Sequence, residues 1–185
     1  METKQSNLGV TYGLIGGLAL SVILLLLYLG GVETFMSPFA WTGYVIIIVL
    51  AVLAGIKQRK LNGGHLEFSQ ALKITFAVFA IGFLIQTIFN YVLMNYIDPS
   101  FRDALVQKTM EKMEELLRRF GTPEDDIDKA LTEGAKSDTY AIKNVLLGYA
   151  ISCFVFFIIS LIISAIIKRS RTSFDNTFTQ QTTNA

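Results

Sequence analysis

Charge is scarce in this sequence, and the shortage limits the classes of protein to which it can belong. Of the 185 residues, 17% are Asp, Glu, Lys or Arg, whereas soluble proteins average about 25%. The formal net charge of +1 gives no support to a nucleic-acid partner. Hydrophobic residues, by contrast, make up 52% of the chain. This balance predicts a membrane protein with the lipid bilayer as its main surroundings.

Cysteine and histidine are almost absent, and their absence excludes several kinds of site. The one cysteine, Cys153, allows no disulfide within the chain, and the one histidine, His65, is too few for most zinc sites. No zinc-protease, phosphate-loop or nucleophile-elbow motif occurs. The acidic run 124–128 lacks the glycine spacing of a calcium loop. We therefore expect no enzyme activity, no catalytic residue, no cofactor and no metal site.

Four long stretches without any charged residue indicate the fold class. Each stretch is 23 to 28 residues long. A helix needs about 20 apolar residues to cross the hydrocarbon layer, and backbone polar groups there must be paired within the segment. The sequence therefore predicts an all-α polytopic membrane protein, with one membrane domain over residues 1–167. Its four transmembrane helices are expected near residues 8–30, 39–56, 71–97 and 142–167.

Lysine and arginine placement predicts the orientation of these helices. The segments 57–60, KQRK, and 168–171, KRSR, carry three basic residues each, whereas the connection between the first two spans carries none. The positive-inside rule then places both termini and the KQRK loop in the cytoplasm. The segment between the third and fourth spans lies on the opposite side. The tail 168–185, rich in Ser, Thr, Asn and Gln, is predicted to be disordered.

The charged segment 98–140 is predicted to form an extracytoplasmic amphipathic helical pair. Asp98 and Pro99 end the third span and begin a new helix, because proline is tolerated only in a first turn. Gly121 is placed to end that helix, and the residues after Pro123 begin another. Five apolar residues of the first helix fall on one side of a helical wheel. They are Val106, Met110, Met113, Leu117 and Phe120.

An apolar face of this size needs a surface to cover it. One hypothesis is packing within the chain or on the membrane surface. The other is docking of a membrane or periplasmic protein partner, or of a second copy in a homo-oligomer. The two methionines of the face favour docking, because their flexible side chains suit an adaptable binding surface. The function favoured here is an accessory or interaction subunit without enzyme activity. The alternative is a small transporter or channel component, although the charged residues within the spans, Lys73 and Lys143, both lie in the first turn of a span.

Small and polar residues within the spans indicate where helices pack. Small residues four apart let helix backbones approach closely, and paired amides form hydrogen bonds between helices. The candidate packing residues are Gly9, Gly13, Gly17 and Ser21 in the first span, and Gln86 and Asn90 in the third.

Two stretches carry a resemblance to a known family. They are LEFSQALKITF at 66–76, with its Lys73, and FNYVLMNYIDPSF at 89–101, with its Asp98-Pro99. The sequence resembles a family of small four-span bacterial membrane proteins, common in Bacteroidota and known only as a domain of unknown function. The resemblance extends over about residues 8 to 167. It implies four spans and an inner-membrane location, and it supplies no activity and no catalytic residue.

Overall fold

The computed structural model describes residues 7–136 and 138–169, and it is built from helices. Four of them are long: α1 (Leu8–Leu29), α3 (Thr42–Leu61), α4 (Phe68–Val92) and α7 (Ile142–Ile167). With short helical extensions, these four are long and apolar enough to span a membrane. The predicted fold class is therefore confirmed, and the chain is a multi-pass membrane protein.

The second and third long helices extend beyond their predicted apolar spans. Helix α3 continues through the KQRK segment to Leu61, and α4 begins at Phe68. Lysine, arginine and glutamine are good helix formers, and cations near a helix C-terminus interact favourably with its dipole. The helices therefore run past the ends of their apolar stretches. The tail predicted to be disordered is 168–185; Lys168 and Arg169 are described, and residues 170–185 lie outside the described residues.

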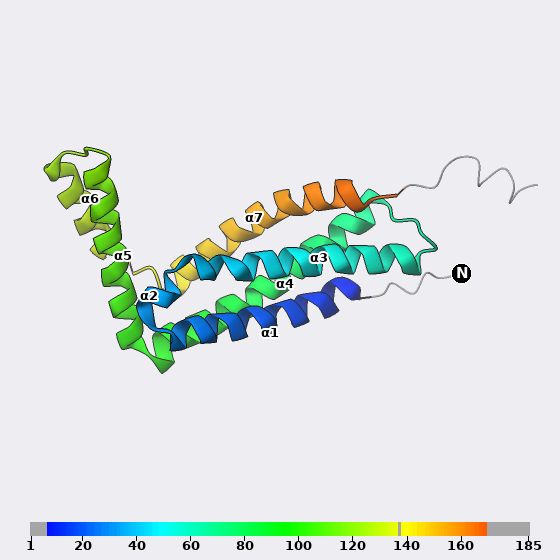
Figure 1. Cartoon of the computed structure of the whole chain (residues 1–185), viewed down its shortest axis with the longest axis horizontal. Helices are drawn as coiled ribbons and strands as arrows, with labels where there is room; N and C mark the ends of the chain where they lie inside the picture. Colours follow the sequence, from blue (N-terminus) through cyan, green and yellow to red (C-terminus); the bar gives the residue numbers. More distant parts are fainter. Residues whose placement is uncertain (1–6, 137, 170–185) are drawn as a thin grey trace, which may run out of the picture. The chain divides into compact units, whose positions relative to one another are not determined.

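Shorter elements connect the long helices. Between α1 and α3 lie α2 (Gly31–Phe35) and the 3-10 helix η1 (Pro38–Trp41). The end of α4 widens into a π-helical turn, η2 (Leu93–Ile97). The charged segment folds as two helices, α5 (Pro99–Arg119) and α6 (Glu124–Lys136), as its capping signals predict. Figure 1 labels α2, α5 and α6 along the chain.

The helices belong to two compact units. The terminal unit comprises Met1–Gly16, Tyr44–Gly82 and Cys153–Ala185. The insert unit comprises Gly17–Gly43 and Phe83–Ser152, so it holds α2, α5 and α6. Helices α1, α4 and α7 contribute residues to both units, as does α3 through its first two residues.

The core of the terminal unit combines aromatic stacking with one buried polar pair. Phe79 of α4 stacks on Phe156 of α7, with ring centroids 4.9 Å apart and an interplanar angle of 6°. The hydroxyls of Thr75 and Ser164 lie 3.1 Å apart, and both side chains are fully buried. A hydrogen bond between buried hydroxyls avoids the cost of leaving either group unpaired.

Two of the glycines predicted to pack lie where α1 meets α4 in the terminal unit. A Cβ atom at Gly9 would lie 2.9 Å from Cβ of Ala77. A Cβ atom at Gly13 would lie 2.9 Å from Cβ of Ile81 and 3.2 Å from the carbonyl oxygen of Ala77. Contacts this short do not fit a side chain, so glycine permits the close approach of the two helices.

The core of the insert unit joins the end of α1 to α4, η2 and α5. Leu24, Leu93, Met94 and Leu105 are buried there. Aromatic residues pack around this cluster, and Phe101 makes edge-to-face contacts with Tyr28 at 4.8 Å and with Phe35 at 5.6 Å. Since Leu105 is part of this core, the first turns of α5 are held against the end of α1 and α2.

Candidate functional site

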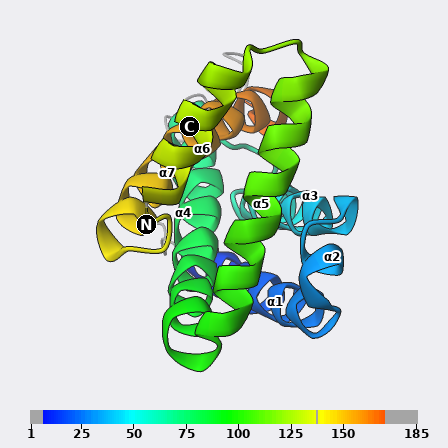
Figure 2. The same cartoon turned by 90° about the vertical axis from the view of Figure 1, so that its left-hand side faces the viewer.

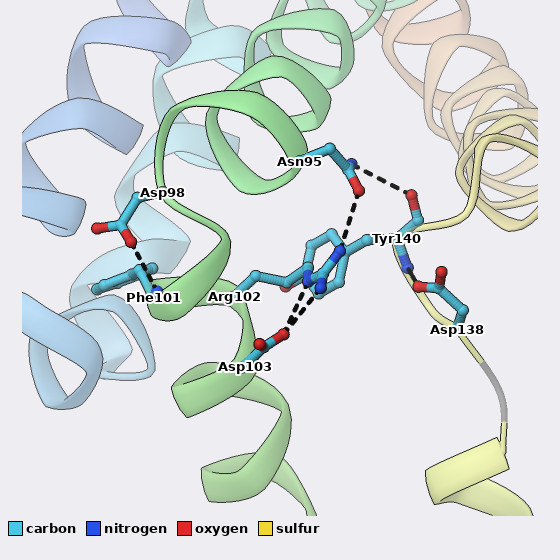
Figure 3. A network of polar contacts seen from close by, with 7 residues as sticks. All are labelled: Asn95, Asp98, Phe101, Arg102, Asp103, Asp138 and Tyr140. Carbon is cyan, nitrogen blue, oxygen red and sulfur yellow. Dashed lines mark hydrogen bonds and ion pairs between the residues drawn. The ribbon is translucent and has the colours of Figure 1, made fainter.

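Helix α5 begins at a carboxylate that receives two hydrogen bonds. Asp98 is the N-cap, and its Oδ1 accepts a hydrogen bond of 2.9 Å from the backbone N–H of Phe101 (Figure 3). Its Oδ2 accepts a hydrogen bond of 2.9 Å from the hydroxyl of Tyr28. The Phe101 N–H, followed by the Tyr28 hydroxyl, lowers the pKa of Asp98 below its usual value. The cap predicted from Asp98-Pro99 thus forms, and α1 supplies an additional donor.

The π-helical turn η2 precedes this cap and places a polar side chain at the base of α5. The N–H of Asp98 reaches back five residues to the carbonyl of Leu93, at 2.9 Å. Within the widened turn, the amide of Asn95 donates to the carbonyl of Tyr140 at 3.3 Å and accepts from Arg102 Nη1 at 3.3 Å (Figure 3). The third span, α5 and the segment before α7 therefore meet at one side chain.

The segment that leads from α6 to α7 is fixed at the same place. The backbone N–H of Tyr140 donates to Asp138 Oδ1 at 3.1 Å, and Asn144 donates to the carbonyl of Asp138 at 2.7 Å. Burial raises the pKa of the Tyr140 hydroxyl. We call Asn95, Asp98, Arg102 and Tyr140 the junction. Its hydrogen bonds link the end of the third span, the start of α5 and the segment before α7.

Beyond the junction, α5 and α6 pack side by side (Figure 2). Gly121 has a φ of +72°, which glycine adopts readily, and it reverses the chain between the two helices. Ile127 of α6 is buried, and a Cβ atom at Gly134 would lie 2.8 Å from Cε of Met110. Arg118 forms ion pairs with Glu114 and with Glu124 across the turn. Helix α6 therefore covers part of the apolar face of α5.

The five predicted docking residues divide into two groups in the structure. Val106, Met110 and Leu117 are half-buried. Met113 remains 42% exposed and Phe120 remains 82% exposed, and the adjacent Leu116 is 53% exposed. The predicted face is thus only partly open. We call Met113, Leu116 and Phe120 the exposed apolar face.

Charged residues of both signs lie beside this face. Glu115 and Arg119 form an ion pair at 2.6 Å, one turn apart. Further toward the junction, Lys108 contacts Glu33 of α2 at 3.1 Å and Glu111 at 3.3 Å, and both carboxylates raise the pKa of Lys108. Neither sign of charge dominates, so a ligand of strong single charge has little to bind here.

The remaining candidate residues lie within the helices of the spans. Ser21 donates a hydrogen bond of 2.9 Å to the carbonyl of Gly17, so this serine is bonded within its own helix. Gln86 and Asn90 are half-buried on α4, and Asn90 Oδ1 is a buried atom that accepts no hydrogen bond from the described residues. Their role between helices stays a prediction. Over residues 7–136 and 138–169, no three His, Cys, Asp or Glu side chains are grouped to hold a metal ion.

Two functional relationships were not foreseen from the sequence. Nothing in the spacing of Tyr28 indicated that it would bond the N-cap of α5, since the two residues are 70 positions apart. The π-helical turn that presents Asn95 also left no signal, although amide side chains near the end of a span are a reason to look for one.

Comparison with known families gives a match to a family model. The family model described as "Protein of unknown function (DUF4199)" matches residues 11–169. Comparison with curated proteins and with solved structures gives no match. The matched range includes α5, α6 and the junction, so these elements lie within the region shared with the family.

Proposed function

We propose that this chain, which belongs to the DUF4199 family of proteins of unknown function, is a non-enzymatic membrane protein that docks a partner protein through α5 and α6. The matched range covers most of the 185 residues. Its four apolar helices make it a multi-pass membrane protein. The docking role, the partner and the lack of catalysis belong to the proposal.

The proposal includes an orientation and a membrane. Both termini lie in the cytoplasm, and the membrane is the inner membrane of a bacterium. Support comes from the basic residues at 57–60 and 168–169, which adjoin the ends of spans, and from the absence of lysine and arginine between α1 and α3. The helical pair α5 and α6 then lies on the extracytoplasmic side.

The observation that carries the docking proposal is the exposed apolar face. Helix α6 and the core of the insert unit already cover the other apolar side chains of α5, such as Leu105 and Met110. Met113, Leu116 and Phe120 nevertheless remain open, and Phe120 is 82% exposed. Exposed apolar side chains that adjoin one another on a protein surface are typical of interaction sites.

The occupant we infer is an apolar surface of another protein, with charges of both signs around it. Met113 is an unbranched side chain that adapts to different surfaces, and Phe120 supplies a large apolar contact. The ion pair between Glu115 and Arg119 borders this face and favours a partner without a strong net charge. The contact is small, so we expect a reversible complex.

A photo-crosslinking experiment in cells tests the occupant. A photoreactive amino acid replaces Phe120 in one variant and Gln107, an exposed residue on another side of α5, in a control variant. We expect the first variant alone to form a crosslink to one distinct protein. A crosslink only to lipid or to a second copy of this chain, or equal crosslinking from both positions, would overturn the proposal.

A charge substitution separates docking from internal packing. Met113→Glu places a carboxylate on the exposed apolar face, and Gln107→Glu is the control with the same change in charge. If Met113 faces a partner, both variants should melt within roughly 2 °C of the wild type, and only Met113→Glu should lose the crosslinked protein from a pull-down. If Met113→Glu melts well below its control and keeps the partner, the face serves internal packing only.

A further inference from the structure

The loop between α3 and α4 is paired with the end of α7 through a two-bond backbone bridge. The N–H of Leu66 donates to the carbonyl of Arg169 at 3.0 Å, and the N–H of Arg169 donates to the carbonyl of Leu66 at 2.8 Å. The Leu66 side chain is buried, which fixes the loop. The loop after α3 and the end of α7, which are about a hundred residues apart in sequence, therefore lie together in the terminal unit.

Two side-chain contacts strengthen this arrangement. Arg59 Nη1 donates to the carbonyl of Ile167, the last residue of α7, at 3.5 Å. Lys168 Nζ lies 5.9 Å from the centroid of the Phe68 ring, at the start of α4. We call Arg59, Lys168 and Arg169 the basic cluster. Its residues lie at the ends of α3 and α7, where a carbonyl contacts the side chain of Arg59 and an aromatic ring contacts that of Lys168.

The basic cluster has no acidic partner within the described part of the chain. None of its three residues forms an ion pair with Asp or Glu there, whereas Arg102, Lys108, Arg118, Arg119 and Lys129 of the insert unit all do. The adjacent acid in sequence, Glu67, is exposed and also forms no ion pair among the described residues. The positive charge of the cluster is therefore available to an external anion.

The position of the basic cluster relative to the membrane indicates which kind of anion it would bind. Arg59 follows the apolar part of the second span, and Lys168 follows the fourth span directly. Phe68 begins the third span. The ends of these three spans lie on the same side of the bilayer, because spans two and four cross it in one direction and span three returns. Residues at such ends lie at the level of the lipid headgroups.

We propose that the basic cluster binds the headgroup of an anionic phospholipid. Arginine pairs with phosphate oxygens through two N–H groups, and lysine adds a further positive charge. Phe68 then offers an apolar ring below the phosphate to the first carbons of the lipid chains. A zwitterionic lipid carries its own cation on the headgroup and gains less from the cluster. This site does not depend on the docking role of α5 and α6 or on which side of the membrane is cytoplasmic.

Lipid binding by the purified full chain tests the proposal. The chain is reconstituted in nanodiscs of phosphatidylcholine, with phosphatidylglycerol added as a minor component, and bound lipid is counted by native mass spectrometry. The wild type should retain phosphatidylglycerol in preference to phosphatidylcholine. The variant Lys168→Gln with Arg169→Gln should bind it about thirtyfold more weakly, since each cation near an anionic surface adds roughly fivefold. Both side chains are exposed, and the bridge at Arg169 uses backbone atoms only, so the fold should be retained.

Two further comparisons make the result specific. The control variant, Lys112→Gln with Lys129→Gln on α5 and α6, removes the same charge and should keep the preference for phosphatidylglycerol. Inorganic phosphate at millimolar concentration should not displace the lipid. The proposal is wrong if the wild type shows no preference between the two lipids, if the cluster variant keeps its preference, or if the control loses it equally. Displacement by free phosphate would show a simple anion site instead of a lipid site.

Discussion

The hydroxyl of Tyr28 at the end of α1 donates a hydrogen bond of 2.9 Å to the carboxylate of Asp98, which caps α5. Two elements that are far apart in sequence are thereby joined at the point where the third span gives way to the helical pair. The same carboxylate accepts the N–H of Phe101. Both donors favour the ionised form of Asp98, so the strength of these two hydrogen bonds depends on pH.

The first prediction concerns stability in acid. The folded-state pKa of Asp98 is lowered, so its contribution to stability is present above its unfolded pKa of about 3.9 and is lost as the pH falls through the lower folded value. Asp98→Asn keeps a side chain that can cap the helix and removes this titration. Melting temperatures of wild type and variant, measured from pH 7 to pH 3, should converge as the pH falls below about 4. A constant difference over this range would contradict the role of Asp98.

A second prediction separates the two bonds that Asp98 accepts. Tyr28→Phe removes the hydroxyl donor and keeps the ring that packs on Phe101. It should lower the melting temperature by less than Asp98→Ala, which removes the acceptor for both bonds. Thermal unfolding in detergent at pH 7 checks the order. If Tyr28→Phe lowers the melting temperature as much as Asp98→Ala, the cap at Phe101 contributes little.

The third prediction compares the same substitution at two helical glycines. Gly13→Ala would place a methyl group 2.9 Å from Cβ of Ile81, so α1 and α4 must move apart, at a cost of roughly 1–3 kcal/mol. A Cβ atom at Gly148 of α7 would have no neighbour within 4 Å. Gly148→Ala should therefore stabilise the chain by about 0.5–1 kcal/mol through helix propensity alone. Unfolding free energies that change in the same direction would contradict the close contact at Gly13.

The sequence predicts most of the fold because the membrane imposes strict rules on it. Uncharged runs of more than 20 residues leave few alternatives to spanning helices, and Asp98, Pro99 and Gly121 are strong local signals for helix ends. Local signals act over a few residues. They therefore located α5 and α6 without indicating that Tyr28 would bond to Asp98.

The exposure of the predicted docking residues could be predicted only in part, because it also depends on contacts between distant parts of the chain. A helical wheel shows which residues share a side of α5, and it correctly groups Met113 with Phe120. It cannot show that α6 folds back over Met110, because this contact depends on the packing of Gly134 against it. Coverage by a second element is a property of tertiary packing, so exposure had to come from the structure.

The fourth prediction concerns the buried hydroxyl pair of the terminal unit. Thr75 and Ser164 lie 3.1 Å apart, and Thr75 Oγ1 is also 3.0 Å from the carbonyl of Ala71. Thr75→Val keeps the shape and leaves the Ser164 hydroxyl without this partner. In a double-mutant cycle with Ser164→Ala, we expect a coupling free energy of about 0.6–1.7 kcal/mol, as for other hydrogen bonds between membrane helices. Additive effects of the two substitutions would show that the pair contributes nothing.

The fifth prediction tests the orientation on which the extracytoplasmic position of α5 and α6 depends. In a Cys153→Ser background, Glu67→Cys reports on the loop between α3 and α4, and Thr132→Cys reports on α6; both positions are exposed. A membrane-impermeant maleimide applied to intact cells should label the cysteine at 132 and should reach the one at 67 only after permeabilisation. Retention of lysine and arginine on the cytoplasmic side is the physical reason. Labelling at 67 with protection at 132 would reverse the orientation and would place any partner of α5 in the cytoplasm.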